Sequence, residues 1–116
     1  MHEFSIAMSI IEIAENEATK VNSSTISSLD LDIGTMAGIE FYALDTALEM
    51  AIKETMLENA DIKVRKITAI AKCSDCSFEF EINSITDACP KCNSLFSDII
   101  CGKELKIRSI VVEEDV

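Results

Sequence analysis

Four of the five cysteines form two Cys-x-x-Cys pairs that can bind one metal ion together. The pairs are Cys73/Cys76 and Cys89/Cys92, and 12 residues lie between them. Each pair makes a tight turn that directs two sulfurs at one point, so two pairs supply four thiolates for a tetrahedral zinc ion. A closed shell of four thiolates leaves no open position for a substrate. The spacing therefore predicts a structural zinc site.

Three other chemistries are compatible with paired cysteines: an iron–thiolate centre, a redox dithiol and plain buried cysteines. A redox dithiol needs a lowered thiol pKa in a single Cys-x-x-Cys at the start of a helix, and two facing pairs fit this poorly. Asn93 follows the second pair, where a residue that tolerates positive φ is useful. Cys101 lies outside both pairs, and we expect it to be a small buried hydrophobic residue.

The single histidine, His2, offers a second kind of metal chemistry. We expect the mature chain to begin Met1-His2-Glu3 with a free amine, because a large second side chain blocks removal of the initiator methionine. The amine, the intervening amide nitrogens and the imidazole can then enclose a divalent metal in fused chelate rings. Nitrogen-rich tetragonal sites of this kind suit Ni(II) or Cu(II). The alternative is an ordinary polar residue after a start codon.

Composition and charge narrow the class of protein and of partner. The chain has 116 residues, of which 48% are hydrophobic, and a formal net charge of −11. We expect one domain, or one domain with a small insert. No apolar run approaches the ~20 residues of a membrane span, and residues 1–20 carry four glutamates, so we expect a soluble cytoplasmic protein without membrane association. The acidity disfavours nucleic acid and favours metal cations and basic protein surfaces as partners.

The hydrophobic pattern of the first half predicts two helices and a strand. The first helix spans residues 4–20, and its apolar face comprises Ile6, Ile10, Ile13 and Ala14, with Ala7 and Ile11 beside it. A strand at 26–33 alternates Leu29, Leu31 and Ile33 with polar residues. A second helix covers about 39–52, with Glu40 in its first turn, where a negative charge complements the helix dipole.

The second half predicts two more strands, at 61–72 and 104–112, with the cysteine segment between them. The expected fold is α+β: two helices packed on a small three-stranded sheet, with an inserted four-cysteine domain of the zinc-ribbon kind. We expect one domain to comprise residues 1–72 plus 102–116 and the insert to comprise 73–101. An insert this short cannot bury a core, so metal binding would supply much of its folding free energy.

The motifs occur in an order that resembles a known family. They are the opening Met1-His2-Glu3-Phe4-Ser5-Ile6-Ala7, the strand end Leu31-Asp32-Ile33-Gly34 and the two Cys-x-x-Cys pairs. Together they resemble the HypA family, the nickel metallochaperones of nickel–iron hydrogenase maturation. The resemblance covers essentially the whole chain.

The resemblance implies two metal sites in separate domains. Nickel would be held in the larger domain by the Met1 amine and His2, with Glu3 and the acidic position 40 contributing. That position is Glu40 here, where aspartate is common in the family. Zinc would stay in the insert. The expected partners are a maturation GTPase of the HypB type and the hydrogenase large subunit, and some members of the family also serve urease.

The residues themselves argue against an enzyme. The only histidine lies at the terminus, and the three glycines form no phosphate-binding loop. A nickel carrier is therefore the leading hypothesis. A zinc-ribbon interaction module with an incidental terminus is the second, and a nucleic-acid-binding ribbon is the third, which the acidity disfavours.

Overall fold

The computed structural model describes residues 2–114, which form two helices and six strands. In chain order these are α1 (His2–Lys20), β1 (Ile26–Gly34), α2 (Phe41–Ala51), β2 (Asp61–Ile67), β3 (Ile70–Cys73), β4 (Glu79–Glu81), β5 (Ser97–Cys101) and β6 (Leu105–Val112). Within these residues, no helix is both long enough and apolar enough to cross a membrane.

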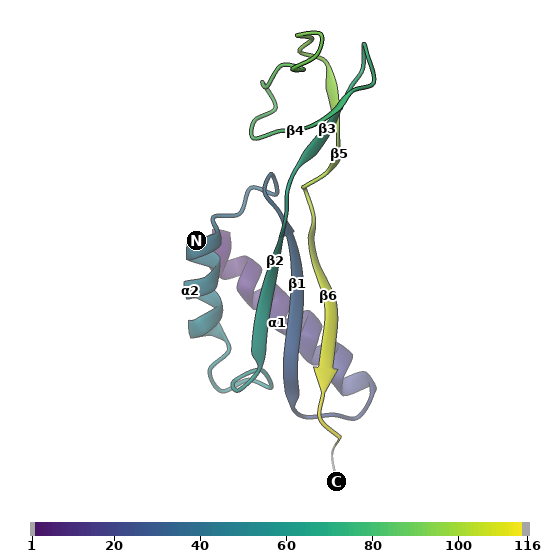
Figure 1. The fold of residues 1–116 in the computed structure, drawn as a ribbon. Coiled ribbons are helices and arrows are strands. Elements are labelled where there is room, and N and C mark those ends of the chain that lie inside the picture. The colour runs from purple at the N-terminus through teal and green to yellow at the C-terminus, as the bar shows by residue number, and fades with distance from the viewer. Residues whose placement is uncertain (1, 115–116) are drawn as a thin grey trace. The chain divides into compact units, whose positions relative to one another are not determined.

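The strands form two three-stranded sheets, ordered β2-β1-β6 and β4-β3-β5 (Figure 1). The described chain also divides into two compact units. The first contains residues 2–31, 39–64 and 106–114, and the second contains 32–38 and 65–105. The predicted α+β fold, with a separate four-cysteine part, is confirmed. The predicted division into a nickel-binding domain of residues 1–72 plus 102–116 and a zinc-binding insert of residues 73–101 stays a prediction.

The larger sheet is mixed in direction. The N–H of Ile26 bonds to Met56, just before β2, and the N–H of Thr35 bonds to Ile67 at the end of β2, so β1 and β2 are parallel. Glu113 donates to Thr25, and Gly34 donates to Glu104, so β1 and β6 are antiparallel. In the smaller sheet, β3 is antiparallel to both of its neighbours.

Helices α1 and α2 are in contact, and α1 buries a narrow stripe of small and branched residues. The buried residues of α1 are Ala7, Ile10, Ile11, Ala14 and Ala18. The prediction of the apolar face was wrong at Ile13, whose side chain is 53% exposed, and Ile6 is only half-buried. At 3.6 residues per turn, Ile13 points about 120° away from the centre of the buried stripe.

Helix α2 begins later than predicted. It starts at Phe41, not at residue 39, and Glu40 is its N-cap, not a residue of its first turn. The Glu40 carboxylate accepts hydrogen bonds from the backbone N–H groups of Tyr42, at 3.2 Å, and Ala43, at 2.7 Å. These groups have no partner within the helix, so a side-chain acceptor stabilises the helix start.

Strand β1 shows the predicted alternation, with one exception. Leu29, Leu31 and Ile33 are buried, but Asp32 between them is also only 2% exposed. Its carboxylate forms a bidentate ion pair with Arg65, at 2.9 Å to Nε and 2.8 Å to Nη2. A buried carboxylate is tolerated when it is paired and hydrogen-bonded in this way.

The single strand predicted at 61–72 is divided. It is interrupted at Thr68–Ala69, and its halves, β2 and β3, belong to different sheets. The Ala69 N–H donates to Thr35 Oγ1 at 3.0 Å. Gly102 approaches Ala69 so closely that a Cβ on the glycine would lie 2.2 Å from the Ala69 Cα. These are contacts between distant parts of the chain, and the local β-branched pattern does not encode them.

Candidate metal centres

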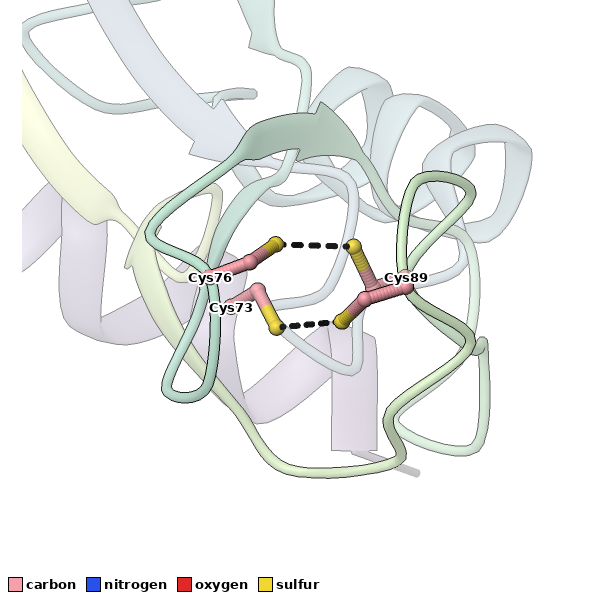
Figure 2. Close-up of side chains that lie close together, drawn as sticks. Cys73, Cys76 and Cys89 are labelled. Carbon is pink, nitrogen blue, oxygen red and sulfur yellow. Dashed lines mark hydrogen bonds between the residues drawn. The ribbon is translucent and has the colours of Figure 1, made fainter.

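The four paired cysteines converge on one point. Their sulfurs all lie within 4.8 Å of one another. Cys73 Sγ is 3.5 Å from Cys92 Sγ, and Cys76 Sγ is 3.6 Å from Cys89 Sγ (Figure 2). Sulfurs that bind one tetrahedral zinc at about 2.3 Å stand about 3.8 Å apart. The cluster is therefore close to the size that zinc requires.

Two similar turns build this cluster. Ser77 and Asn93, each the residue after a Cys-x-x-Cys, have φ angles of 65° and 66°. Each donates its N–H to the carbonyl of the first cysteine of its pair, Cys73 at 2.9 Å and Cys89 at 2.8 Å. The positive φ predicted for Asn93 is confirmed. Its counterpart Ser77 was missed, although the equivalent position in the first pair was the available signal.

The thiols of the cluster have opposed acidities. The backbone N–H of Cys76 lowers the pKa of Cys73 to about 7, although burial opposes this shift. At Cys92 the backbone N–H of Ser94 lowers the pKa, but the hydrogen bond with the Cys73 thiol and burial outweigh it and raise the pKa to about 12. Neighbouring sulfurs thus resist ionising together. A bound divalent cation removes this conflict, because a coordinating thiol is deprotonated outright.

Among the possible chemistries of the cysteines, the geometry argues against a redox dithiol. The two sulfur contacts of 3.5 and 3.6 Å join one pair to the other, whereas a redox dithiol would join the two sulfurs of one Cys-x-x-Cys. Cys101 stands outside the cluster and is half-buried, not buried as predicted. Its thiol donates to the carbonyl of Thr68 at 3.6 Å. Four convergent sulfurs without a fifth ligand suit a structural zinc ion.

The amino-terminal residues of the structure form a second polar cluster. His2 and Glu3 open α1, and their side chains approach to 3.6 Å between Nδ1 and Oε2. The same Glu3 oxygen accepts the backbone N–H of Glu40 at 3.2 Å. This hydrogen bond is the main reason why the pKa of Glu3 is lowered. The fold therefore brings His2, Glu3 and Glu40 to one place, where α1 and α2 both begin.

The other predicted nickel ligand, Met1, lies outside the described residues. The His2 side chain is 65% exposed, so its imidazole is accessible to an incoming metal ion. Glu40 also has a role that was not predicted, since its carboxylate caps α2. Each oxygen of this carboxylate accepts one of the two capping hydrogen bonds. An ionised carboxylate has about four lone-pair sites, so both oxygens can still accept a further bond or bind a metal ion.

Comparisons with known proteins identify the family of this chain. Residues 1–112 match the model of the family described as "Hydrogenase/urease nickel incorporation, metallochaperone, hypA". The chain belongs to the HypA family. The hydrogenase maturation factor HypA of Parabacteroides distasonis is 41% identical over 115 residues, which cover 99% of this chain and 100% of that protein. The HypA of Francisella philomiragia is 38% identical over 111 residues, which cover 96% of this chain and 98% of that protein.

Two solved structures of HypA proteins share the fold. One is a solution structure of a HypA protein; it has a TM-score of 0.70 at 26% identity, and the match covers 97% of both chains. The other, of the nickel metallochaperone HypA from Helicobacter pylori, has a TM-score of 0.68 at 24% identity and covers 97% of this chain and 98% of that one. Membership in a family of metallochaperones confirms the prediction of a nickel carrier for hydrogenase maturation that is not an enzyme.

Proposed function

We propose that this HypA protein binds its nickel cargo through the first residues of the chain. The ligands are the Met1 amine, the neighbouring amide nitrogens and the His2 imidazole, with Glu3 beside them. The observation that carries this proposal is the convergence of His2, Glu3 and Glu40 at the start of α1. Nitrogen ligands in a short stretch of backbone suit the tetragonal preference of Ni(II).

The position of these residues at a helix start makes the amide nitrogens available. The first four N–H groups of a helix have no intrahelical acceptor. Because α1 begins at His2, coordination by the amides of His2 and Glu3 breaks no helical hydrogen bond. The cargo can therefore be loaded and released without unwinding α1.

Glu3 and Glu40 contribute in different ways. Glu3 is within reach of the imidazole, so we propose that it either ligates nickel or orients His2. Glu40 holds the start of α2 through two backbone N–H groups and fixes Glu3 through its own N–H. We propose that Glu40 mainly positions Glu3, and that its remaining lone pairs allow it to ligate nickel directly as well. The carboxylates of Glu3 and Glu40 together place negative charge beside the cation.

Zinc has a structural role in this proposal. Cys73, Cys76, Cys89 and Cys92 would hold one zinc ion, whose charge allows all four thiols to ionise. The second unit has a small core of Ala69, Ala71 and Ile82, and metal binding would supply the remaining folding free energy.

The proposed partners follow from the function of the family. The family model names both hydrogenase and urease nickel incorporation. We propose that this chain works in the cytoplasm with a maturation GTPase of the HypB type and the hydrogenase large subunit, and that urease maturation proteins are alternative recipients. The chain has no phosphate-binding glycine loop among its three glycines, so a partner would supply nucleotide hydrolysis.

Extension of the chain before Met1 tests the nickel site. Two residues, Gly-Ser, added before Met1 move the free amine away from His2 and should abolish tight, stoichiometric nickel binding in calorimetric titrations of the zinc-loaded protein. The same dipeptide added after Val116 is the matched control and should leave binding intact. Equal nickel affinity in the two proteins would reject the amino-terminal site. An unchanged fold and zinc content in both proteins would exclude misfolding as the cause of any loss of nickel binding.

A further inference from the structure

Ser97, the first residue of β5, carries a buried hydroxyl that has no hydrogen-bond partner. Across residues 2–114, its Oγ is the single buried side-chain oxygen or nitrogen in this condition. A buried hydroxyl without a partner costs free energy, so it calls for an explanation, such as an acceptor that is present only in one state of the protein.

The strand register places Ser97 beside a cysteine of the cluster. Ser97 is directly opposite Cys73, the last residue of β3. The N–H of Cys73 donates to the carbonyl of Phe78, whereas the next residues outward, Ser74 and Phe96, are joined by an N–H···O bond of 2.8 Å. Cys73 and Ser97 are therefore a non-hydrogen-bonded pair on the same face of the sheet. The Cβ atoms of such pairs are about 4.5–5.5 Å apart, the closest approach across an antiparallel ladder.

A zinc-bound thiolate at Cys73 is the acceptor that this hydroxyl lacks. A thiol that coordinates a metal loses its proton, and a hydrogen bond to an ionised acceptor is stronger than one to a neutral acceptor. Cys73 is only 1% exposed, so water is poorly placed to supply this bond. The sulfur of Cys89, which is equally buried, has a backbone donor beside it, the N–H of Lys91 at 3.4 Å.

We propose that Ser97 is a positioning residue of the four-cysteine site, whose Oγ–H donates a hydrogen bond to the Cys73 thiolate when zinc is bound. This role rests on the zinc site proposed above. The bond would fix the direction of the Cys73 sulfur and draw negative charge away from a set of four thiolates. Because the hydroxyl is satisfied only when the sulfur is ionised, its burial favours the zinc-bound state over the zinc-free state.

Ser97→Ala tests the proposal on the full-length protein, because it removes the donor and adds no bulk. Competition with a chromophoric chelator should show that zinc affinity falls by about 10–100-fold, the usual effect of removing a hydrogen-bond partner of a metal ligand. In the Co(II)-substituted protein, the sulfur-to-cobalt charge-transfer absorption should move to lower energy, since a thiolate without this donor is more electron-rich. Ser97→Thr keeps a hydroxyl and should retain the wild-type affinity and spectrum.

Ser74→Ala is the matched control. Ser74 follows Cys73 directly and is exposed, so the loss of its hydroxyl should change neither measurement. Unchanged zinc affinity in Ser97→Ala, a weaker affinity with an unchanged cobalt spectrum, or a Ser97→Thr variant as weak as Ser97→Ala would each overturn the role of Ser97. A wild-type chain that binds no zinc would overturn the metal site itself, so the two failures are distinguishable.

Discussion

The carboxylate of Glu3 accepts a hydrogen bond from the backbone N–H of Glu40, with 3.2 Å between Oε2 and the nitrogen. These residues are 37 positions apart, and each lies at the beginning of a helix. The bond therefore joins the N-terminal ends of α1 and α2. Helix N-termini carry partial positive charge, so carboxylates are stabilised there. The carboxylates of Glu3 and Glu40, which lie at these two helix starts, form the negative surroundings proposed for nickel.

Replacement of His2 by alanine should abolish specific nickel binding and leave the fold and the zinc content unchanged. The imidazole is exposed and belongs to no core, so its loss affects only the proposed chelate. Isothermal titration with Ni(II) measures the effect, and Glu12→Ala, which removes an exposed acid from the same helix, is the control. Nickel binding of unchanged stoichiometry and affinity in His2→Ala would mean that the cargo site lies elsewhere.

Glu3→Gln should reduce the dependence of stability on pH. The folded state lowers the pKa of Glu3, so its ionised form stabilises the protein above the ordinary glutamate pKa of about 4.3, and this contribution disappears as pH falls through the lower folded value. Urea unfolding at about pH 6 and about pH 3 should show that the wild-type advantage at the higher pH is absent at the lower. A constant difference between the two proteins would count against this linkage.

Cys73→Ser should remove zinc from the protein and unfold the cysteine segment. Zinc binding in such sites supplies apparent free energies of about 10–16 kcal/mol, and three thiolates with an open position hold the metal less tightly. Zinc content by mass spectrometry and amide NMR spectra would measure both effects. Cys101→Ser should change neither, because this thiol lies outside the four-sulfur cluster. Full zinc content in Cys73→Ser would argue against the site.

Glu40→Ala should destabilise the protein by about 1 kcal/mol, the usual effect of removing a helix N-cap acceptor. Glu40→Asp should retain most of the stability, since aspartate is a preferred N-cap. Urea unfolding curves of the three proteins provide the comparison. Nickel titration of Glu40→Asp then separates capping from ligation: unchanged affinity in a stable protein would support a positioning role.

Arg65→Met should destabilise the protein by about 2–3 kcal/mol. Removal of one partner of a buried ion pair costs roughly 3–5 kcal/mol, and the 58% exposure of the Arg65 side chain reduces this because water can take the place of the lost guanidinium beside Asp32. Lys63→Met, in the same strand, removes an exposed pair with Asp61 and should cost no more than about 0.5 kcal/mol. Equal effects of the two substitutions would show that Asp32 does not depend on Arg65 for its stability in the fold.

Local chemistry made the four-cysteine cluster predictable. The spacing of two Cys-x-x-Cys pairs specifies four convergent sulfurs, and the structure has them. The positive φ at Asn93 was also predictable, because a tight turn requires it at that point. Periodicity found both helices and the strands of the larger sheet.

What the sequence could not show depends on contacts between distant residues. The break after β2 reflects the approach of Gly102 to Ala69, which no window around residue 69 contains. The burial of Asp32 depends on Arg65, which is 33 positions away. The exposure of Ile13 also escaped prediction, because an isoleucine near an apolar stripe looks like core until the packing of α1 is known.

Each Cys-x-x-Cys contributes one buried and one exposed cysteine residue: Cys73 and Cys89 are buried, and Cys76 and Cys92 are exposed. A metal held by this set has a solvent side and a protein side. A competing chelator or a thiol-modifying reagent would meet Cys76 and Cys92 first, while the two inner sulfurs keep hold of the ion. Zinc would then leave in stages, with a half-released intermediate that can recapture its ligands, and its residence time would be set by the inner pair.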